Sequence, residues 1–144
     1  MKHARVVYRG VVQSATEAAA GPSGETGGVR LADGTVVAET DVTWLSPVRP
    51  RTIFAIGLNY VDHAKELAFE KPSEPMVFFK GPNTVTGHRS VTRRPEGLDF
   101  MHYECELAVV IGKPARNVPR DRALYHVQGY TGANDYAFRG YLRN

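Results

Sequence analysis

The chain has 144 residues, which is enough for one domain, or for a small domain and part of another. Its hydrophobic content of 42% and its net charge of +3, from scattered Lys and Arg, are typical of a globular protein and unlike a nucleic-acid-binding surface. No apolar run is long enough to span a bilayer, and the first residues do not form a signal peptide. The only cysteine, Cys105, excludes internal disulfide bonds. We therefore expect a cytoplasmic protein that binds neither nucleic acid nor membrane.

The first fifty residues are rich in short β-prone runs. These runs cover residues 4–13, 29–31 and 35–38. The pair Asp33-Gly34 separates the last two runs, which predicts a hairpin. Pro47 and Pro50 disfavour regular structure and indicate a linker. Residues 1–48 are thus predicted to form a small β module, and no chemistry is predicted in it.

The remainder of the chain, residues 51–144, reads as mixed α+β, mainly β. The predicted elements are a strand at 53–56, a helix at about 60–69, strands at 76–80, 103–111 and 128–134, a short helix at 119–127, and a last helix from about Tyr136. The apolar run at 53–56 is typical of a strand buried on both faces, and Asn59 can cap the helix that follows. Residues 81–99 are expected to be mostly loop, and Trp44 and the Phe78-Phe79 pair are expected in the core.

Two glutamates, Glu104 and Glu106, stand at the start of the apolar run at 107–111. In a strand they share one face, about 7 Å apart, where a divalent cation relieves their repulsion. Asp135, at the end of a later strand, is the candidate third ligand. Three carboxylates favour Mg²⁺ or Mn²⁺ over zinc. In isolation, Glu-x-Glu is more often a solvated strand face. His102 falls on the same face and is expected to be a neighbour; as a ligand it would favour zinc or iron. Cys105 alternates with the glutamates and is expected to face the core as an inert thiol.

A second set of residues has the pattern of proton transfer and anion binding. His63 and Glu66 share one face of the predicted helix, where the carboxylate can orient the imidazole as a general base. The alternative is an exposed histidine on an amphipathic helix. Arg139, one helical turn after Asp135, and Lys80, at the end of a strand, can bind a substrate carboxylate. For each of these two cations a plain surface charge is an equal alternative.

Four segments resemble motifs of the fumarylacetoacetate hydrolase superfamily in the same order and spacing: 53–66 (IFAIGLNYVDHAKE), 79–84 (FKGPNT), 102–107 (HYECEL) and 129–136 (GYTGANDY). The resemblance implies a mixed β-sandwich roll, usually homodimeric, of which residues 51–144 form the N-terminal part. The module before Pro50 is similar to an N-terminal domain that many members carry.

The resemblance also implies the roles of the residues selected above. Glu104, Glu106 and Asp135 match carboxylates that hold the divalent cation. His63 and Glu66 match a proton-transfer dyad on a segment that closes over substrate, and Arg139 matches a substrate-facing arginine. The implied function is metal-dependent decarboxylation or isomerisation of small 2-oxo or 2-hydroxy-diene di- and tricarboxylates in aromatic catabolism. The alternatives are hydrolysis of a carbon–carbon bond in acylpyruvates or fumarylacetoacetate, and an inactive metal-binding fragment.

Two departures from the family pattern affect these expectations. Gly140 follows Arg139 where the family usually has Asp, and the likeness stops at Asn144 while the family domain continues. The continuation supplies the rest of the roll and a lysine near the metal. We therefore expect a truncated product that carries the ligands and the dyad but lacks part of the pocket.

Overall fold

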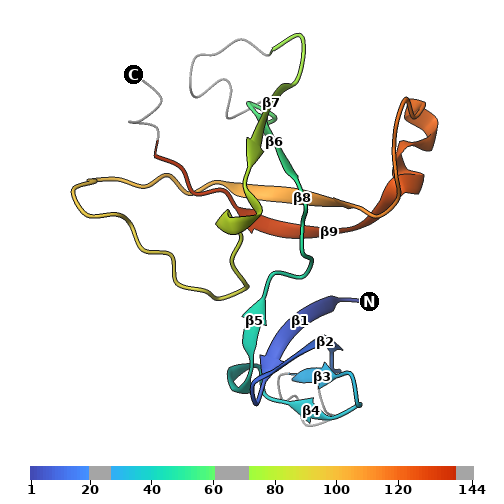
Figure 1. The fold of residues 1–144 in the computed structure, drawn as a ribbon, viewed down its shortest axis with the longest axis vertical. Coiled ribbons are helices and arrows are strands. Elements are labelled where there is room, and N and C mark those ends of the chain that lie inside the picture. The colour runs from blue at the N-terminus through green and yellow to red at the C-terminus, as the bar shows by residue number, and fades with distance from the viewer. Residues whose placement is uncertain (20–26, 61–71, 139–144) are drawn as a thin grey trace. The chain divides into compact units, whose positions relative to one another are not determined.

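The computed structural model describes residues 1–19, 27–60 and 72–138. The chain divides into two compact units, Met1–Val91 and Thr92–Asn144. The strands of the described residues form three separate sheets, one of five strands and two of two strands (Figure 1). All strand pairs are antiparallel. In the part of the chain that is described, no helix is both long and apolar enough to cross a membrane.

The five-stranded sheet occupies the predicted N-terminal β module, in the order β4-β3-β2-β1-β5. Its strands are β1 (His3–Tyr8), β2 (Val11–Glu17), β3 (Val29–Leu31), β4 (Val36–Val37) and β5 (Thr43–Leu45), with a 3-10 turn η1 (Glu39–Asp41) before β5. One face of the sheet holds the buried core, which consists of Val6, Ala15, Val29, Leu31 and Val42. Trp44 is half-buried and packs against this core, in line with its predicted place.

The strand predicted over residues 4–13 was wrong as a single element. The chain reverses at Arg9 and Gly10, whose φ angles are 47° and 79°, and β1 pairs with β2 across this turn. Positive φ at both central residues is the geometry that suits a two-residue hairpin. The Arg9 guanidinium lies 5.2 Å from the centre of the Tyr8 ring, which adds a contact at the turn.

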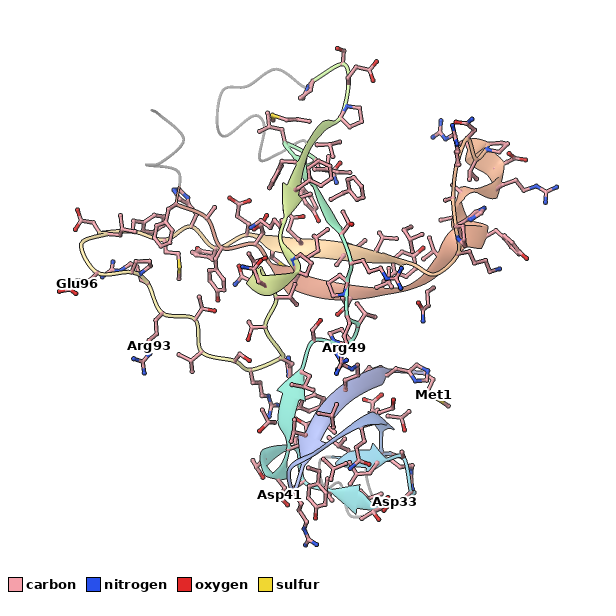
Figure 2. All side chains as sticks on the ribbon, viewed as in Figure 1. Met1, Asp33, Asp41, Arg49, Arg93 and Glu96 are labelled. Carbon is pink, nitrogen blue, oxygen red and sulfur yellow. The ribbon has the colours of Figure 1, made fainter. Side chains whose placement is uncertain are left out.

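The hairpin predicted at Asp33-Gly34 is present between β3 and β4. Gly34 has a φ of 89°, and the Asp33 carboxylate accepts a hydrogen bond of 2.9 Å from the Thr35 N–H. Figure 2 labels Asp33 at this turn. Hydrogen bonds from Thr35 to the charged form lower the pKa of the Asp33 carboxyl below its usual value.

The second sheet of the first unit is a hairpin of β6 (Ile53–Gly57) and β7 (Met76–Lys80). Strand β7 has the predicted bounds. The expectations that residues 53–56 are buried on both faces and that Phe78 and Phe79 lie in the core were wrong. Phe54 and Phe79 pair across the strands with ring centroids 4.9 Å apart, yet Phe79 is 70% exposed and Phe78 is exposed too. A two-stranded sheet has no second layer over its faces among the described residues, so most of its apolar side chains remain exposed. The predicted helix at 60–69 lies almost wholly outside the described residues.

The second unit is built on a hairpin of β8 (Cys105–Ile111) and β9 (Val127–Asn134), linked through a 3-10 helix η3 (Arg120–His126). Both strands and the short helix lie where the sequence predicts them. The helix predicted from Tyr136 is wrong for residues 136–138, because Ala137 continues the ladder in an isolated bridge with His102. Residues 81–99 are mostly irregular as expected, with one 3-10 turn η2 (Pro82–Thr84).

The two faces of β8 differ, and Cys105 lies on the opposite side from the predicted one. Burial alternates along the strand: Glu106, Ala108 and Val110 are half-buried, whereas Cys105 is exposed. The exposed face is mainly apolar: it carries Cys105, Leu107, Val109, Ile111 and, from β9, Tyr130, with Asn134 opposite Cys105. The alternation predicted from the sequence is therefore present, but the apolar face is not covered by other described residues. This is why the thiol is exposed.

Candidate metal and substrate site

The β8–β9 register brings the three predicted carboxylates to one face. The pairs His102–Ala137 and Cys105–Asn134 belong to the same unshifted register, which places Glu104 opposite Asp135. Directly opposite residues of an antiparallel pair point to the same side, with Cβ atoms about 4.5–5.5 Å apart. Glu106 lies two residues from Glu104 on that face. The sequence pattern alone could not place Asp135 opposite Glu104, because it does not give the pairing of the strands.

Two hydrogen bonds donated by backbone N–H groups hold the chain at this position. The Asp135 N–H donates to the Glu104 carbonyl over 2.8 Å, and the Glu104 N–H donates to Oδ1 of Asn134 over 2.9 Å. The Asn134 side chain thus supplies the acceptor for the N–H of a candidate ligand. Sequence reasoning did not select Asn134. The signal available was an amide side chain directly before Asp135 at the end of a strand.

The carboxylates are half-buried at the open end of the hairpin, where the ladder continues to His102 and Ala137. Among the described residues, no three His, Cys, Asp or Glu side chains lie close enough together to hold a metal ion. The donor set nevertheless fits a hard divalent cation, because it consists of three carboxylates on one face. The ring of His102 packs edge-on against Phe100, with centroids 4.8 Å apart.

Of the other predicted site residues, the structure describes only Lys80. His63, Glu66 and Arg139 lie outside the described residues. Lys80 is described: it is half-buried at the end of β7 and pairs with Ile53. It belongs to the unit Met1–Val91, and the three carboxylates belong to Thr92–Asn144.

The sequence of residues 52–144 matches the protein family described as fumarylacetoacetate (FAA) hydrolase C-terminal. This chain belongs to the fumarylacetoacetate hydrolase family. The matched region starts one residue after the predicted start of the second part of the chain and contains every candidate site residue.

Relatives and solved structures agree with this assignment. A homoprotocatechuate catabolism bifunctional isomerase/decarboxylase from Escherichia coli is 54% identical over 114 residues, 76% of this chain and 27% of that protein. The crystal structure of 5-carboxymethyl-2-hydroxymuconate delta-isomerase from Mycobacterium smegmatis has a TM-score of 0.80 at 30% identity, over 99% of this chain and 57% of that chain. Fumarylacetoacetate hydrolase from Exiguobacterium antarcticum has a TM-score of 0.73 at 25% identity, over 99% and 58%.

These comparisons confirm the predicted fold class, mainly β and of the fumarylacetoacetate hydrolase type. The match with this chain covers about a quarter of the length of the E. coli relative and a little over half of each of the two solved structures.

Proposed function

We propose that this chain carries the cation ligands of a decarboxylase/isomerase that acts on small 2-oxo or 2-hydroxy-diene di- and tricarboxylates in aromatic catabolism. The observation that carries the proposal is the β8–β9 register, which gives Glu104, Glu106 and Asp135 a common face. The name of the 54% identical relative supports the reaction class. The proposed cation is Mg²⁺ or Mn²⁺, and the proposed assembly is a homodimer.

The proposed roles follow from the chemistry of each side chain. Glu104, Glu106 and Asp135 would hold the cation, which when bound would supply Lewis acidity to stabilise negative charge on substrate oxygens. Lys80 and Arg139 bind the substrate carboxylates and so orient the substrate. When the carbon–carbon bond to the departing carboxyl group breaks, CO₂ leaves and the bonding electron pair stays on the substrate. His63 then delivers a proton from its imidazole to carbon. In isomerisation of a 2-hydroxy-diene, the hydroxyl oxygen loses a proton and a carbon of the diene gains one. His63 moves this proton, and Glu66 accepts a hydrogen bond from the other ring N–H.

The experiment that tests the metal site compares Glu106→Gln with Glu96→Gln. Both changes remove one carboxylate charge. Glu96 lies in the irregular segment before β8, outside the candidate site, and is labelled in Figure 2. Calorimetric titration with Mn²⁺ is expected to show binding by the wild-type chain and by Glu96→Gln, and none by Glu106→Gln. Equal binding by Glu106→Gln and wild type would remove the basis of the proposal.

A comparison of His63→Ala with the wild type distinguishes an enzyme from a module that only binds metal. His63→Ala is expected to retain Mn²⁺ binding and to lose turnover. If the wild-type chain binds Mn²⁺ but shows no turnover, the result favours the alternative of an inactive metal-binding fragment.

The hydrolase alternative is favoured by one observation, the likeness to the Exiguobacterium fumarylacetoacetate hydrolase. Product analysis distinguishes the two reactions. Release of CO₂ or formation of an isomer supports the decarboxylase/isomerase, whereas two carboxylic acids formed with uptake of water support the hydrolase.

A further inference from the structure

The β6–β7 hairpin carries Lys80 at the end where the hairpin joins the rest of its unit. Lys80 pairs with Ile53, the first residue of β6, so the chain enters and leaves the hairpin beside Lys80. The entering connection is residues 46–52, and the leaving connection is residues 81–91. Both belong to the same compact unit as the N-terminal β module. The position of Lys80 therefore depends on what holds these two connections.

The entering connection is tied to the module by hydrogen bonds. Nη1 of Arg5, on β1 between β2 and β5, donates to the Ser46 carbonyl over 3.0 Å in a partly buried contact. Oγ of Ser46 donates in turn to the Val48 carbonyl over 2.7 Å. The chain is thus attached to β1 directly after it leaves β5.

The leaving connection contacts the module at three consecutive residues, which we name the 87–89 anchor. Gly87 lies so close to β5 that a Cβ there would be 2.0 Å from the Trp44 carbonyl oxygen. The His88 ring meets the Trp44 ring edge-on, with centroids 5.2 Å apart and an interplanar angle of 84°. The Arg89 guanidinium pairs with the Glu39 carboxylate over 2.8 Å.

The 87–89 anchor holds the chain in a conformation that the local sequence does not favour. Arg89 has a φ of 57°, in the left-handed region that a residue with a Cβ adopts at a cost. Contacts on Trp44 and Glu39 offset this cost. An aromatic pair and an exposed ion pair are individually weak, but together they act on one short segment.

The chain between Lys80 and the 87–89 anchor begins with a structured turn. Thr84 donates to the Gly81 carbonyl twice, from its backbone N–H over 3.0 Å and from Oγ1 over 2.8 Å. This closes the turn η2 directly after Lys80. A displacement of the anchor is therefore passed toward Lys80 through a chain that is partly rigid.

We propose that the N-terminal β module positions Lys80 by holding both connections of the β6–β7 hairpin, with Glu39, Trp44, His88 and Arg89 as positioning residues. The module, for which the sequence predicts no chemistry, thereby contributes to substrate binding. The importance of Lys80 for substrate rests on the proposed function, whereas the anchoring itself does not.

The test uses charge reversal in the full chain: Glu39→Arg, Arg89→Glu and the double variant that exchanges the two charges. Lys2→Glu is the matched control, because Lys2 pairs with Glu17 over 2.6 Å and both residues belong to the module, outside the two connections. Arg89→Ala is a milder variant in case a reversal prevents folding, which circular dichroism reveals.

Two readouts follow the two parts of the proposal. Trp44 is the only tryptophan of the chain, so quenching of its fluorescence by acrylamide reports whether the 87–89 anchor covers it. The rate of Lys80 acylation, measured by peptide mass spectrometry relative to Lys113, reports whether Lys80 has moved. We expect each single reversal to raise quenching and to change the relative rate by up to about fivefold, the range for one exposed ion pair. The double variant is expected to restore both, and Lys2→Glu to change neither.

Three results decide between the claims. Unchanged Trp44 quenching in the single variants would overturn the anchor. Raised quenching with an unchanged Lys80 rate would overturn the positioning role and leave a purely structural contact. Oxalate binding in the presence of Mn²⁺ is measured on the same variants: its absence in the wild type contradicts the proposed function, while the anchor is still judged by quenching and acylation.

Discussion

Asn134 offers the most specific perturbation of the candidate site, because its side chain accepts the N–H of Glu104 without carrying a ligand charge. Asn134→Ala removes this acceptor from the Glu104 N–H and leaves the bond from the Asp135 N–H to the Glu104 carbonyl in place. A neutral hydrogen bond contributes about 1 kcal/mol net, which is about a fivefold change in an equilibrium constant. Groups that orient metal ligands from outside typically alter affinity by about 10-fold to 100-fold. The exposure of Asn134 places the expected effect at the low end of that range.

The assay is titration with Mn²⁺, followed by calorimetry or by the loss of the free-ion electron paramagnetic resonance signal. We predict that Asn134→Ala weakens Mn²⁺ binding by about fivefold to tenfold. Asn134→Asp keeps an acceptor oxygen and is predicted to bind at least as tightly as the wild type. A dissociation constant unchanged by Asn134→Ala, in a variant with wild-type secondary structure, would refute the role given to Asn134.

Three further predictions concern the fold. Val6→Ala, at a fully buried core position, is expected to lower the free energy of unfolding by about 2–3 kcal/mol in a urea titration, because it loses buried apolar area and leaves a cavity. Val11→Ala, at an exposed position, is the control and is expected to change the free energy of unfolding by less than about 0.5 kcal/mol. Gly112→Ala is expected to lower the melting temperature, because its Cβ would lie 2.6 Å from Gln128 Cβ; an unchanged value would contradict the close approach. A nuclear magnetic resonance titration is expected to give Asp33 a pKa below its usual value of 3.8. The contribution of this carboxylate to stability is therefore complete above pH 3.8 and is lost as the pH falls through the folded-state pKa. A pKa at or above 3.8 would contradict the Thr35 hydrogen bonds.

The sequence located those elements whose limits are set by local chemistry. Strand β7 ends where the apolar run gives way to Lys80 and Gly81, and the β3–β4 hairpin turns at Asp33-Gly34, as predicted. The Arg9-Gly10 turn was missed, because Arg is uncommon at positive φ and the flanking valines read as one continuous strand.

Features that depend on distant contacts were predicted less well. Alternation correctly gave Glu106 and Cys105 opposite faces, but not which face is covered, since burial depends on other layers of structure. The extended backbone at Ala137 likewise comes from its bridge to His102, a partner far away in the sequence. The role of Asn134 required the strand register. The assignments of His63, Glu66 and Arg139 stay predictions.

The thermal unfolding of this 144-residue chain, with and without Mn²⁺ plus oxalate, tests the central claim that Glu104, Glu106 and Asp135 hold a divalent cation. A ligand that binds only the folded state stabilises it by about 2.7 kcal/mol at a hundredfold excess over its dissociation constant. The account predicts a cooperative transition that Mn²⁺ moves to higher temperature and oxalate moves further, with both shifts lost in Glu106→Gln. A transition that neither addition moves, or the same shift in Glu106→Gln, would contradict it.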